Sequence, residues 1–409
     1  MKDRLLSFID KCGPYAVELE TELCKRPAMS PDSGGEGELD KCLFLEHWLR
    51  EQGISRLERY DAPDERAKGG MRPNLIATIE GTEAACLWIM SHLDVVPPGD
   101  ITMWDTDPWT AVYAEDVPGK RVIGRGTEDN QQGLVSSVLA ALAFVKQGLQ
   151  PRRTLKLLFA ADEETGSEYG IDWLLKNHGN LFSPNDMVLI PDSGDKKGIG
   201  IEIAEKNLIW ARFITKGKQT HGSRPDQGIN AHLAGAELLL RLHTELSEIF
   251  SAHDPLFEPD YSTFQPTKKE ANVPNINTIP GEDVFCMDMR ILPQYSAQSV
   301  LREIDRIKTE LELKHTITIE YSLPQLNESP ATAADAPLIA KLSGAISEVY
   351  GVSPHPIGIG GGTVGSFLRR AGLDCAVWAR IDETAHQPNE YALLDNILGD
   401  AKVFALMCM

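Results

Sequence analysis

The sequence predicts an α/β fold: a mostly parallel sheet flanked by helices, with an α+β domain inserted into it. In the first half of the chain, short apolar runs alternate with helical patterns, which is typical of parallel strands joined by helices. From about Lys206 the pattern changes to strands of alternating polarity and two long helices, typical of a helical layer on an antiparallel sheet. We therefore expect one domain of residues 1–205 plus 324–409 and an inserted domain of residues 206–323.

The individual elements follow from the same patterns in chain order. An amphipathic helical period covers much of residues 1–52, and a strong helical pattern covers residues 131–146. Short apolar runs predict the strands of the first domain, at residues 74–79, 86–90, 155–161, 187–190 and 374–381. In the inserted domain we expect strands at residues 208–215, 284–291 and 316–321 and helices at residues 230–250 and 296–313.

Composition limits the classes of function. The chain has 409 residues, with 40 Lys and Arg against 60 Asp and Glu, a formal net charge of −20. Such an acidic chain is a poor candidate for binding nucleic acid or an anionic membrane, but it suits cations. Its seven cysteines are scattered without a C-x-x-C pair, which indicates reduced thiols and a cytoplasmic protein. The first ten residues are no signal peptide, and no apolar run has the length of a membrane span.

One stretch places three acidic residues directly after a strand predicted to be buried on both faces. Asp162, Glu163 and Glu164 follow the apolar run of residues 155–161. Three adjacent like charges repel one another unless a cation lies among them, and chemistry in open α/β sheets lies at the carboxyl ends of the strands. The alternative is a solvated loop that caps the next helix, and this stretch alone does not decide between the two.

Four further strand or turn ends carry His, Asp or Glu. They are His92 with Asp94, Asp129, Asp192, and the segment 382–386, which ends in His386. Two imidazoles and several carboxylates at one edge of a sheet suit a divalent ion such as zinc, cobalt or manganese. A set rich in carboxylates with only two histidines indicates two ions bridged by one carboxylate.

These segments, in this order, resemble the M20 family of co-catalytic metallopeptidases and amidohydrolases. That family includes succinyl-diaminopimelate desuccinylase, acetylornithine deacetylase and the carboxypeptidase G2 type. The matching segments are residues 91–94, 124–129, 162–166, 191–192 and 385–386. One departure is the segment 130–133, Asn-Gln-Gln-Gly, where relatives often carry Met or Asp and then Lys before the Gly. It leaves the metal ligands intact, and we expect it to alter the pocket wall.

The resemblance assigns a role to each residue of the first domain, the di-metal catalytic domain. The implied metal ligands are His92 and Asp192 for one ion, Glu164 and His386 for the other, and Asp129 bridging both. Two divalent ions are implied, zinc first, with cobalt or manganese as alternatives. Glu163 is the implied general base, which takes a proton from the attacking water and passes it to the leaving amine. Asp94 lies two residues after His92, so it can hold the imidazole N–H. Asp162 receives no role.

In the inserted domain, which the resemblance makes a lid and dimerisation domain, the implied residues are fewer. His221 corresponds to the histidine that stabilises the oxyanion, often from the partner subunit, so a homodimer is expected. Arg290 corresponds to the arginine that clamps a substrate carboxylate, and Asn277 is expected to line the same pocket. The turn of Gly361, Gly362 and Thr363 offers backbone N–H groups near that carboxylate.

The function predicted is hydrolysis of the amide bond of an N-acyl amino acid or short peptide that bears a free carboxylate. A two-metal phosphoesterase is the alternative, because the same ligands suit phosphoryl transfer. Residues 360–365 also match G-x-G-x-x-G, a dinucleotide-binding motif. We do not expect a nicotinamide oxidoreductase, because residues 353–358 do not indicate the buried strand that such a site requires. A non-catalytic binding protein is not expected either, since every ligand and base position is present.

Overall fold

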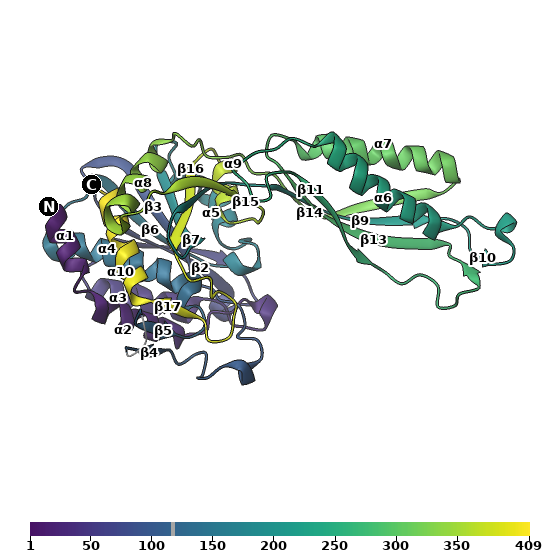
Figure 1. Cartoon of the computed structure of the whole chain (residues 1–409). Helices are drawn as coiled ribbons and strands as arrows, with labels where there is room; N and C mark the ends of the chain where they lie inside the picture. Colours follow the sequence, from purple (N-terminus) through teal and green to yellow (C-terminus); the bar gives the residue numbers. More distant parts are fainter. Residues whose placement is uncertain (116–118) are drawn as a thin grey trace. The chain divides into compact units, whose positions relative to one another are not determined.

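The computed structural model describes residues 1–115 and 119–409. The chain forms two compact units (Figure 1). The first comprises Met1–Ile203, Thr332–Pro356 and Phe367–Met409, and the second comprises Ala204–Ala331 and Ile357–Ser366. The second unit thus contains the predicted inserted domain and also residues 357–366, which we had assigned to the first domain. That segment contacts the second unit directly, since Lys206 N donates to Ile359 O at 3.0 Å.

Most strands of a mostly parallel sheet of eight strands belong to the first unit, so the predicted α/β class is confirmed. The strand order is β1-β2-β6-β3-β7-β16-β8-β15, and β6, β3, β7 and β16 run parallel to one another. These strands are β1 (Leu57–Pro63), β2 (Met71–Ile79), β3 (Glu83–His92), β6 (Arg153–Ala160), β7 (Met187–Asp195), β8 (Gly200–Glu205), β15 (His355–Ile359) and β16 (Asp374–Arg380). The central strands are apolar along nearly their whole length because helices flank the sheet.

Among residues 1–115 and 119–409, seven α-helices belong wholly to the first unit. They are α1 (Lys2–Ile9), α2 (Gly13–Cys24), α3 (Leu39–Glu51), α4 (Gly133–Gln147), α5 (Ile171–His178), α8 (Pro337–Tyr350) and α10 (Leu394–Met407). Helix α4 is buried from Gly133 to Phe144. It begins very close to β7, because a Cβ atom on Gly133 would lie 2.4 Å from Pro191 O. A glycine at this position therefore lets α4 begin against the end of β7.

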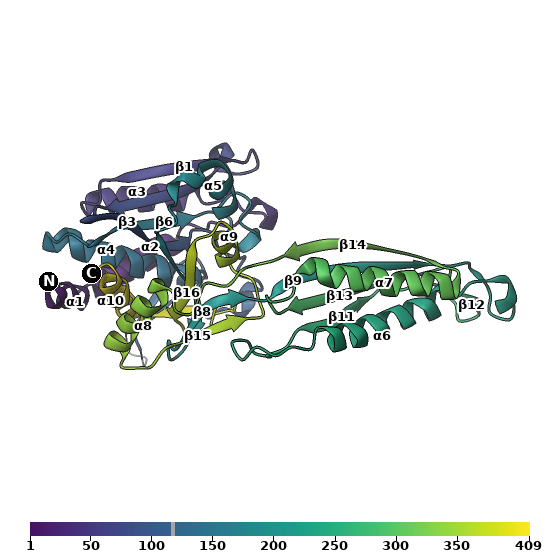
Figure 2. The same cartoon turned by 90° about the horizontal axis from the view of Figure 1, so that it is seen from above.

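The second unit is an antiparallel sheet with two long helices (Figure 2). Its strands, in the order β11-β13-β9-β14, are β11 (Thr263–Lys269), β13 (Glu282–Ile291), β9 (Asn207–Lys216) and β14 (Thr318–Asn327). The helices are α6 (Ala231–Ile249) and α7 (Ala297–His315), and their apolar faces share one core with the sheet. Phe213 and Phe285 stack in this core with ring centroids 5.1 Å apart. Two short strands, β10 (Thr220–His221) and β12 (Thr278–Ile279), pair separately.

The Gly-rich turn does lie between a strand and a helix, but the strand is not the buried one that a dinucleotide site requires, since Gly358 alone of its five residues is buried. Strand β15 precedes it and a short helix, α9 (Gly365–Arg370), follows it. The two prolines at 354 and 356 obscured the strand, but β15 is at the edge of the sheet, where a proline needs no ladder hydrogen bond. Dinucleotide sites form instead at strands inside a parallel sheet, so this context does not favour a nicotinamide site.

Candidate metal centre

Three neighbouring strands deliver predicted ligands to one edge of the parallel sheet. His92 is the last residue of β3, Glu163 and Glu164 follow the end of β6, and Asp192 lies near the end of β7. These strands are adjacent in the order β6-β3-β7 and run parallel, so their carboxyl ends meet. The location is the one expected for a functional site in an open α/β sheet.

The other two ligands come from loops joined by a small sheet. Strand β5 (Arg121–Ile123) leads into the loop that carries Asp129, and β17 (Tyr391–Leu393) follows the loop that carries His386. The two strands pair antiparallel, with Val122 opposite Ala392. This pairing joins segments more than 250 residues apart in the chain and brings Asp129 to His386.

The five predicted ligands form two groups that share Asp129. In the first group, His92 Nε2 lies 2.9 Å from Asp129 Oδ1 and 3.2 Å from Asp192 Oδ1. In the second, His386 Nε2 lies 3.0 Å from Asp129 Oδ2 and 3.2 Å from Glu164 Oε2. Within each group the ligand atoms lie within 4.8 Å of one another. The two oxygens of Asp129 thus face different histidines, as expected of a bridging carboxylate.

The chemistry of these donors fits divalent ions. His92 Nδ1 lies 3.0 Å from the backbone oxygen of Asp94, which leaves Nε2 as the ligand nitrogen when the ring is neutral. Glu164 Oε1 is buried and has no hydrogen-bond partner among the residues that the structure describes. A buried carboxylate oxygen without a donor is costly unless a cation binds it. The orphaned oxygen and the mixed nitrogen and oxygen donors both suit metal binding.

In the metal-free protein, protons take the place of the cations. Burial lowers the pKa of His92, but the charge of Asp192 and hydrogen bonds with Asp129, Asp192 and Asp94 outweigh burial and raise it well above the usual value. The pKa of His386 is raised to about 10 by hydrogen bonds with Asp129 and Glu164, although burial acts in the opposite sense. Burial raises the pKa of Asp129, yet its contacts with His386 and His92 leave it lowered.

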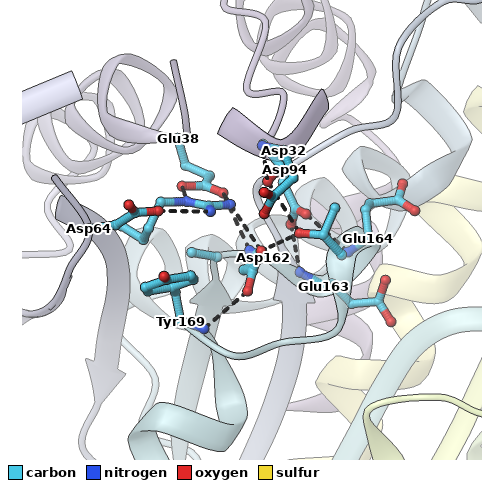
Figure 3. Close-up of polar contacts among 12 residues, drawn as sticks. Asp32, Glu38, Asp64, Asp94, Asp162, Glu163, Glu164 and Tyr169 are labelled. Carbon is cyan, nitrogen blue, oxygen red and sulfur yellow. Dashed lines mark hydrogen bonds and ion pairs between the residues drawn. The ribbon is translucent and has the colours of Figure 1, made fainter. Parts of the chain in front are cut away.

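Asp94 contacts both the histidine and the acidic turn. Its backbone oxygen binds the His92 ring, whereas its carboxylate Oδ1 is 3.5 Å from the same nitrogen. That carboxylate accepts hydrogen bonds from the backbone N–H groups of Glu163 and Glu164, both at 3.0 Å. Burial, followed by the charges of nearby carboxylates such as Asp192, raises the pKa of Glu163 well above its usual value. Figure 3 shows the side chains of Glu163 and Glu164 extending away from Asp162.

Two buried glutamates that the sequence analysis missed join the metal-ligand loops. Glu128, next to Asp129, accepts hydrogen bonds from the loop before His386. Its carboxylate binds the backbone N–H groups of Asp382 at 2.7 Å and Ala385 at 3.0 Å, together with the backbone N–H and hydroxyl of Thr384. Glu128 therefore fixes the loop that positions His386, the last of the predicted metal ligands.

Glu390 makes the reciprocal contact from the loop after His386. Its carboxylate accepts the backbone N–H groups of Gly126 at 3.1 Å and of Glu128 and Asp129 at 3.0 Å, and it pairs with Arg125. Glu128 lies within the matching segment 124–129 and Glu390 lies four residues after His386, and this proximity to predicted ligands was the only sequence signal. An acidic residue beside a ligand looks like a solvated surface residue until its burial is known.

The remaining predicted residues lie in the second unit, in two separate places. His221 is exposed, with Nδ1 2.8 Å from Ser223 Oγ, and Gly222 N donates to Asn277 O at 2.6 Å. Arg290 donates to both oxygens of Asp288 at 2.7 and 2.9 Å and to Gly360 O at 2.8 Å. In the turn beside it, which includes Gly361 and Gly362, the Thr363 hydroxyl donates to Glu205 at 2.6 Å. The structure thus brings His221 to Asn277 and Arg290 to the Gly-rich turn.

Comparison with known proteins shows the family. The model of peptidase family M20/M25/M40 matches residues 88–409. A metallohydrolase of Methanococcus maripaludis is 36% identical over 408 residues, covering 95% of this chain and 97% of the relative. Succinyl-diaminopimelate desuccinylase 2 of Shewanella loihica is 27% identical, covering 92% and 95%.

Solved structures share the fold at low identity. Aminopeptidase PepT of Bacillus cereus superposes with a TM-score of 0.75 at 17% identity, covering 97% of this chain and 98% of that one. The dipeptidase Dug1p of Saccharomyces cerevisiae gives 0.72 at 17% identity, covering 100% and 98%. The protein is a metal-dependent hydrolase. The chain belongs to peptidase family M20/M25/M40, so the predicted resemblance is confirmed. No helix among residues 1–115 and 119–409 is long and apolar enough to cross a membrane.

Metal binding should release protons. Because the pKa of His386 is raised to about 10 and that of His92 is also raised, both rings are protonated in the metal-free protein near neutral pH. A metal ion binds only the neutral ring, so each occupied group should release about one proton, and affinity should fall by up to about tenfold per pH unit for each histidine as the pH decreases. Calorimetric titration of Zn²⁺ in buffers of different ionisation enthalpy measures this release. An absence of proton release below pH 8 would contradict the assignment of these rings.

The Glu128 contacts predict a selective loss of metal affinity. Glu128→Gln removes the charge that binds the loop of residues 382–385, so the group containing His386 should bind metal about 10- to 100-fold more weakly, while the group containing Asp192 is less affected. Titration with Co²⁺, followed by its visible absorption, resolves the two events. Glu383→Gln is the matched control, because Glu383 is an exposed residue of the same loop. Equal affinities in both variants would show that Glu128 does not position His386.

Proposed function

We propose that this protein is a two-metal amide hydrolase that cleaves N-acyl amino acids or short peptides bearing a free carboxylate. The observation that carries the proposal is the pair of ligand groups that share Asp129, with Glu163 beside them. Similarity to a succinyl-diaminopimelate desuccinylase supports acylated amino acids as substrates. Short peptides are supported by the solved dipeptidase of the same fold.

Zinc is the ion that we propose for both groups, with cobalt or manganese as substitutes, because histidine nitrogen and carboxylate oxygen suit all three. When bound, the ions polarise the substrate carbonyl and make water more acidic. Glu163 then moves the proton. Its raised pKa, caused by burial and by neighbouring carboxylates, suits a group that accepts a proton from the attacking water and donates it to the leaving amine.

Arg290 and the Gly-rich turn are the proposed site for the substrate carboxylate. Asp288 holds the guanidinium in one orientation, and Gly360 O accepts a further N–H. The second N–H of each terminal nitrogen is left to bind a carboxylate. Backbone N–H groups of Gly361, Gly362 and Thr363 would complete this site.

We also propose a homodimer in which His221 acts on a substrate held by the other chain. Strands β9 and β13 separate His221 from Arg290: Arg290 pairs with Leu208 at one end of β9, and His221 follows Lys216 at the other end. The separation is roughly 25 Å at about 3.3 Å per residue. One small substrate can therefore contact both residues only if they come from two chains, and Asn277 would accompany His221.

The cytoplasm is the proposed location. All seven cysteines are free thiols, and six of them are buried. Free cysteines in this number are typical of proteins in a reducing compartment such as the cytoplasm.

Replacement of the general base tests the function. Glu163→Ala should lower kcat for an N-acyl amino acid by about 10²- to 10⁴-fold while metal content stays near about two ions per chain. A panel of N-succinyl, N-acetyl, dipeptide and phosphodiester substrates, with metal analysis of each preparation, measures both quantities. Wild-type turnover by Glu163→Ala would refute its role, and cleavage of only the phosphodiester would favour a phosphoesterase.

Mixing two variants tests the dimer. His221→Ala and Arg290→Ala should each have low activity on a carboxylate-bearing substrate. If His221 acts across the dimer, mixed dimers contain one intact site, and activity should recover to about a quarter of wild type after subunit exchange. Sedimentation confirms that dimers form. No recovery from exchanged dimers would place both residues in the same chain's site, and a fully active monomer would remove the dimer altogether.

A further inference from the structure

The turn of Asp162, Glu163 and Glu164 contains three adjacent acids, yet only two of them face the metal groups. Asp162 is buried, with 2% of its surface exposed, and Figure 3 shows it directed toward Glu38, Asp64 and Tyr169. We propose that Arg72, a residue of β2, is a positioning residue that binds Asp162 and thereby holds Glu163 in its catalytic orientation. This inference rests on the proposed function of Glu163 as the base.

Arg72 is a buried cation among buried carboxylates. Its side chain has no exposed surface, and neither does that of Glu38. The guanidinium binds both oxygens of Glu38, with Nε 2.7 Å from Oε2, and a terminal nitrogen lies 3.2 Å from Asp162 Oδ1. Asp64 Oδ2 is 3.7 Å from the other terminal nitrogen. Arg72 is thus the cation that allows Asp162 to be buried as an anion.

The contacts of Asp162 continue into the backbone of the turn. The backbone of Asp162 adopts the left-handed conformation, with φ of 64°. One carboxylate oxygen accepts the Thr165 hydroxyl, and the other accepts the N–H of Tyr169 at 3.0 Å. Its own N–H donates to Glu38 at 3.3 Å, and its backbone oxygen accepts the N–H of Ser167 at 2.6 Å. Arg72 therefore holds the side chain of Asp162 directly, and it holds the main chain through Glu38, which accepts the N–H of Asp162.

The neighbouring residues then have little freedom. Asp94 accepts the N–H groups of Glu163 and Glu164 from the metal side of the turn. Asn74, two residues after Arg72 on β2, accepts the N–H of Ala161 at 3.1 Å. The turn is therefore held before, at and after Asp162. Loss of Arg72 would remove the cation that contacts both Glu38 and Asp162, and the repulsion between these buried carboxylates would displace the backbone that carries Glu163.

The test compares two buried arginines. Arg72→Lys keeps the charge but loses the bidentate contact, whereas Arg369→Lys makes the same change at a buried arginine of the first unit that pairs with Glu202 at 2.6 Å. We expect Arg72→Lys to lower kcat for an N-acyl amino acid by about 10- to 100-fold, with KM and metal content unchanged. Hydrogen exchange of the peptide covering residues 161–169 should become faster. Arg369→Lys should keep the kcat and the exchange rate of the wild type.

Each outcome decides. Asp162→Asn should reproduce the loss of kcat. The double variant should be no less active than the less active single variant, because both changes break the same contact. If Arg72→Lys does not fold, Asp162→Asn alone tests the inference. Unchanged kcat and exchange in Arg72→Lys would overturn the inference, and so would a loss of activity explained by lost metal. If the wild type cleaves no amide, the proposed function fails. In that case, unchanged hydrogen exchange of residues 161–169 in Arg72→Lys would also show that Arg72 does not hold the turn. Faster hydrogen exchange would show that Arg72 holds the turn, with no role in amide cleavage.

Discussion

The carboxylate of Asp129 faces two histidines, one through each oxygen, and the arrangement of the first unit follows from bringing those histidines to it. His92 comes from a central strand and His386 from a loop near the other end of the chain. Like charges gathered at one point must be compensated. The structure provides two kinds of compensation: ligand groups that suit external cations, and the internal cation Arg72.

Two acids in the ligand loops do not face the metal groups. Glu128 binds the loop before His386, and Glu390 binds the loop that carries Asp129. Each carboxylate satisfies several backbone N–H groups that would otherwise be buried without a partner. These reciprocal hydrogen bonds join the two loops into one structural unit. The position of one predicted ligand therefore depends on the loop that carries the other.

Much of this was accessible from the sequence. The apolar runs that lead to His92, Glu164 and Asp192 are strands followed by predicted ligands, and parallel strands bring such ends to one edge. The roles of Arg72, Glu128 and Glu390 were not accessible, because burial of a charged residue depends on partners far away in the chain. Arg72 follows a polar loop and resembles a surface residue, and only its contact with Glu38 and Asp162 shows otherwise. The strand β15 was missed because Pro356 within it and Pro354 just before it disfavour a strand except at an edge.

The pairing of β5 with β17 also determines how late in synthesis the second ligand group can form. During synthesis on the ribosome, β3, β6 and β7 emerge with His92, Glu164 and Asp192 long before His386, and the whole inserted domain is translated in between. Strand β16, which lies between β7 and β8 in the sheet, is translated in between as well. The second ligand group therefore cannot assemble on a nascent chain that ends before His386. Metal acquisition at that group would therefore follow translation of both the inserted domain and the segment that carries His386.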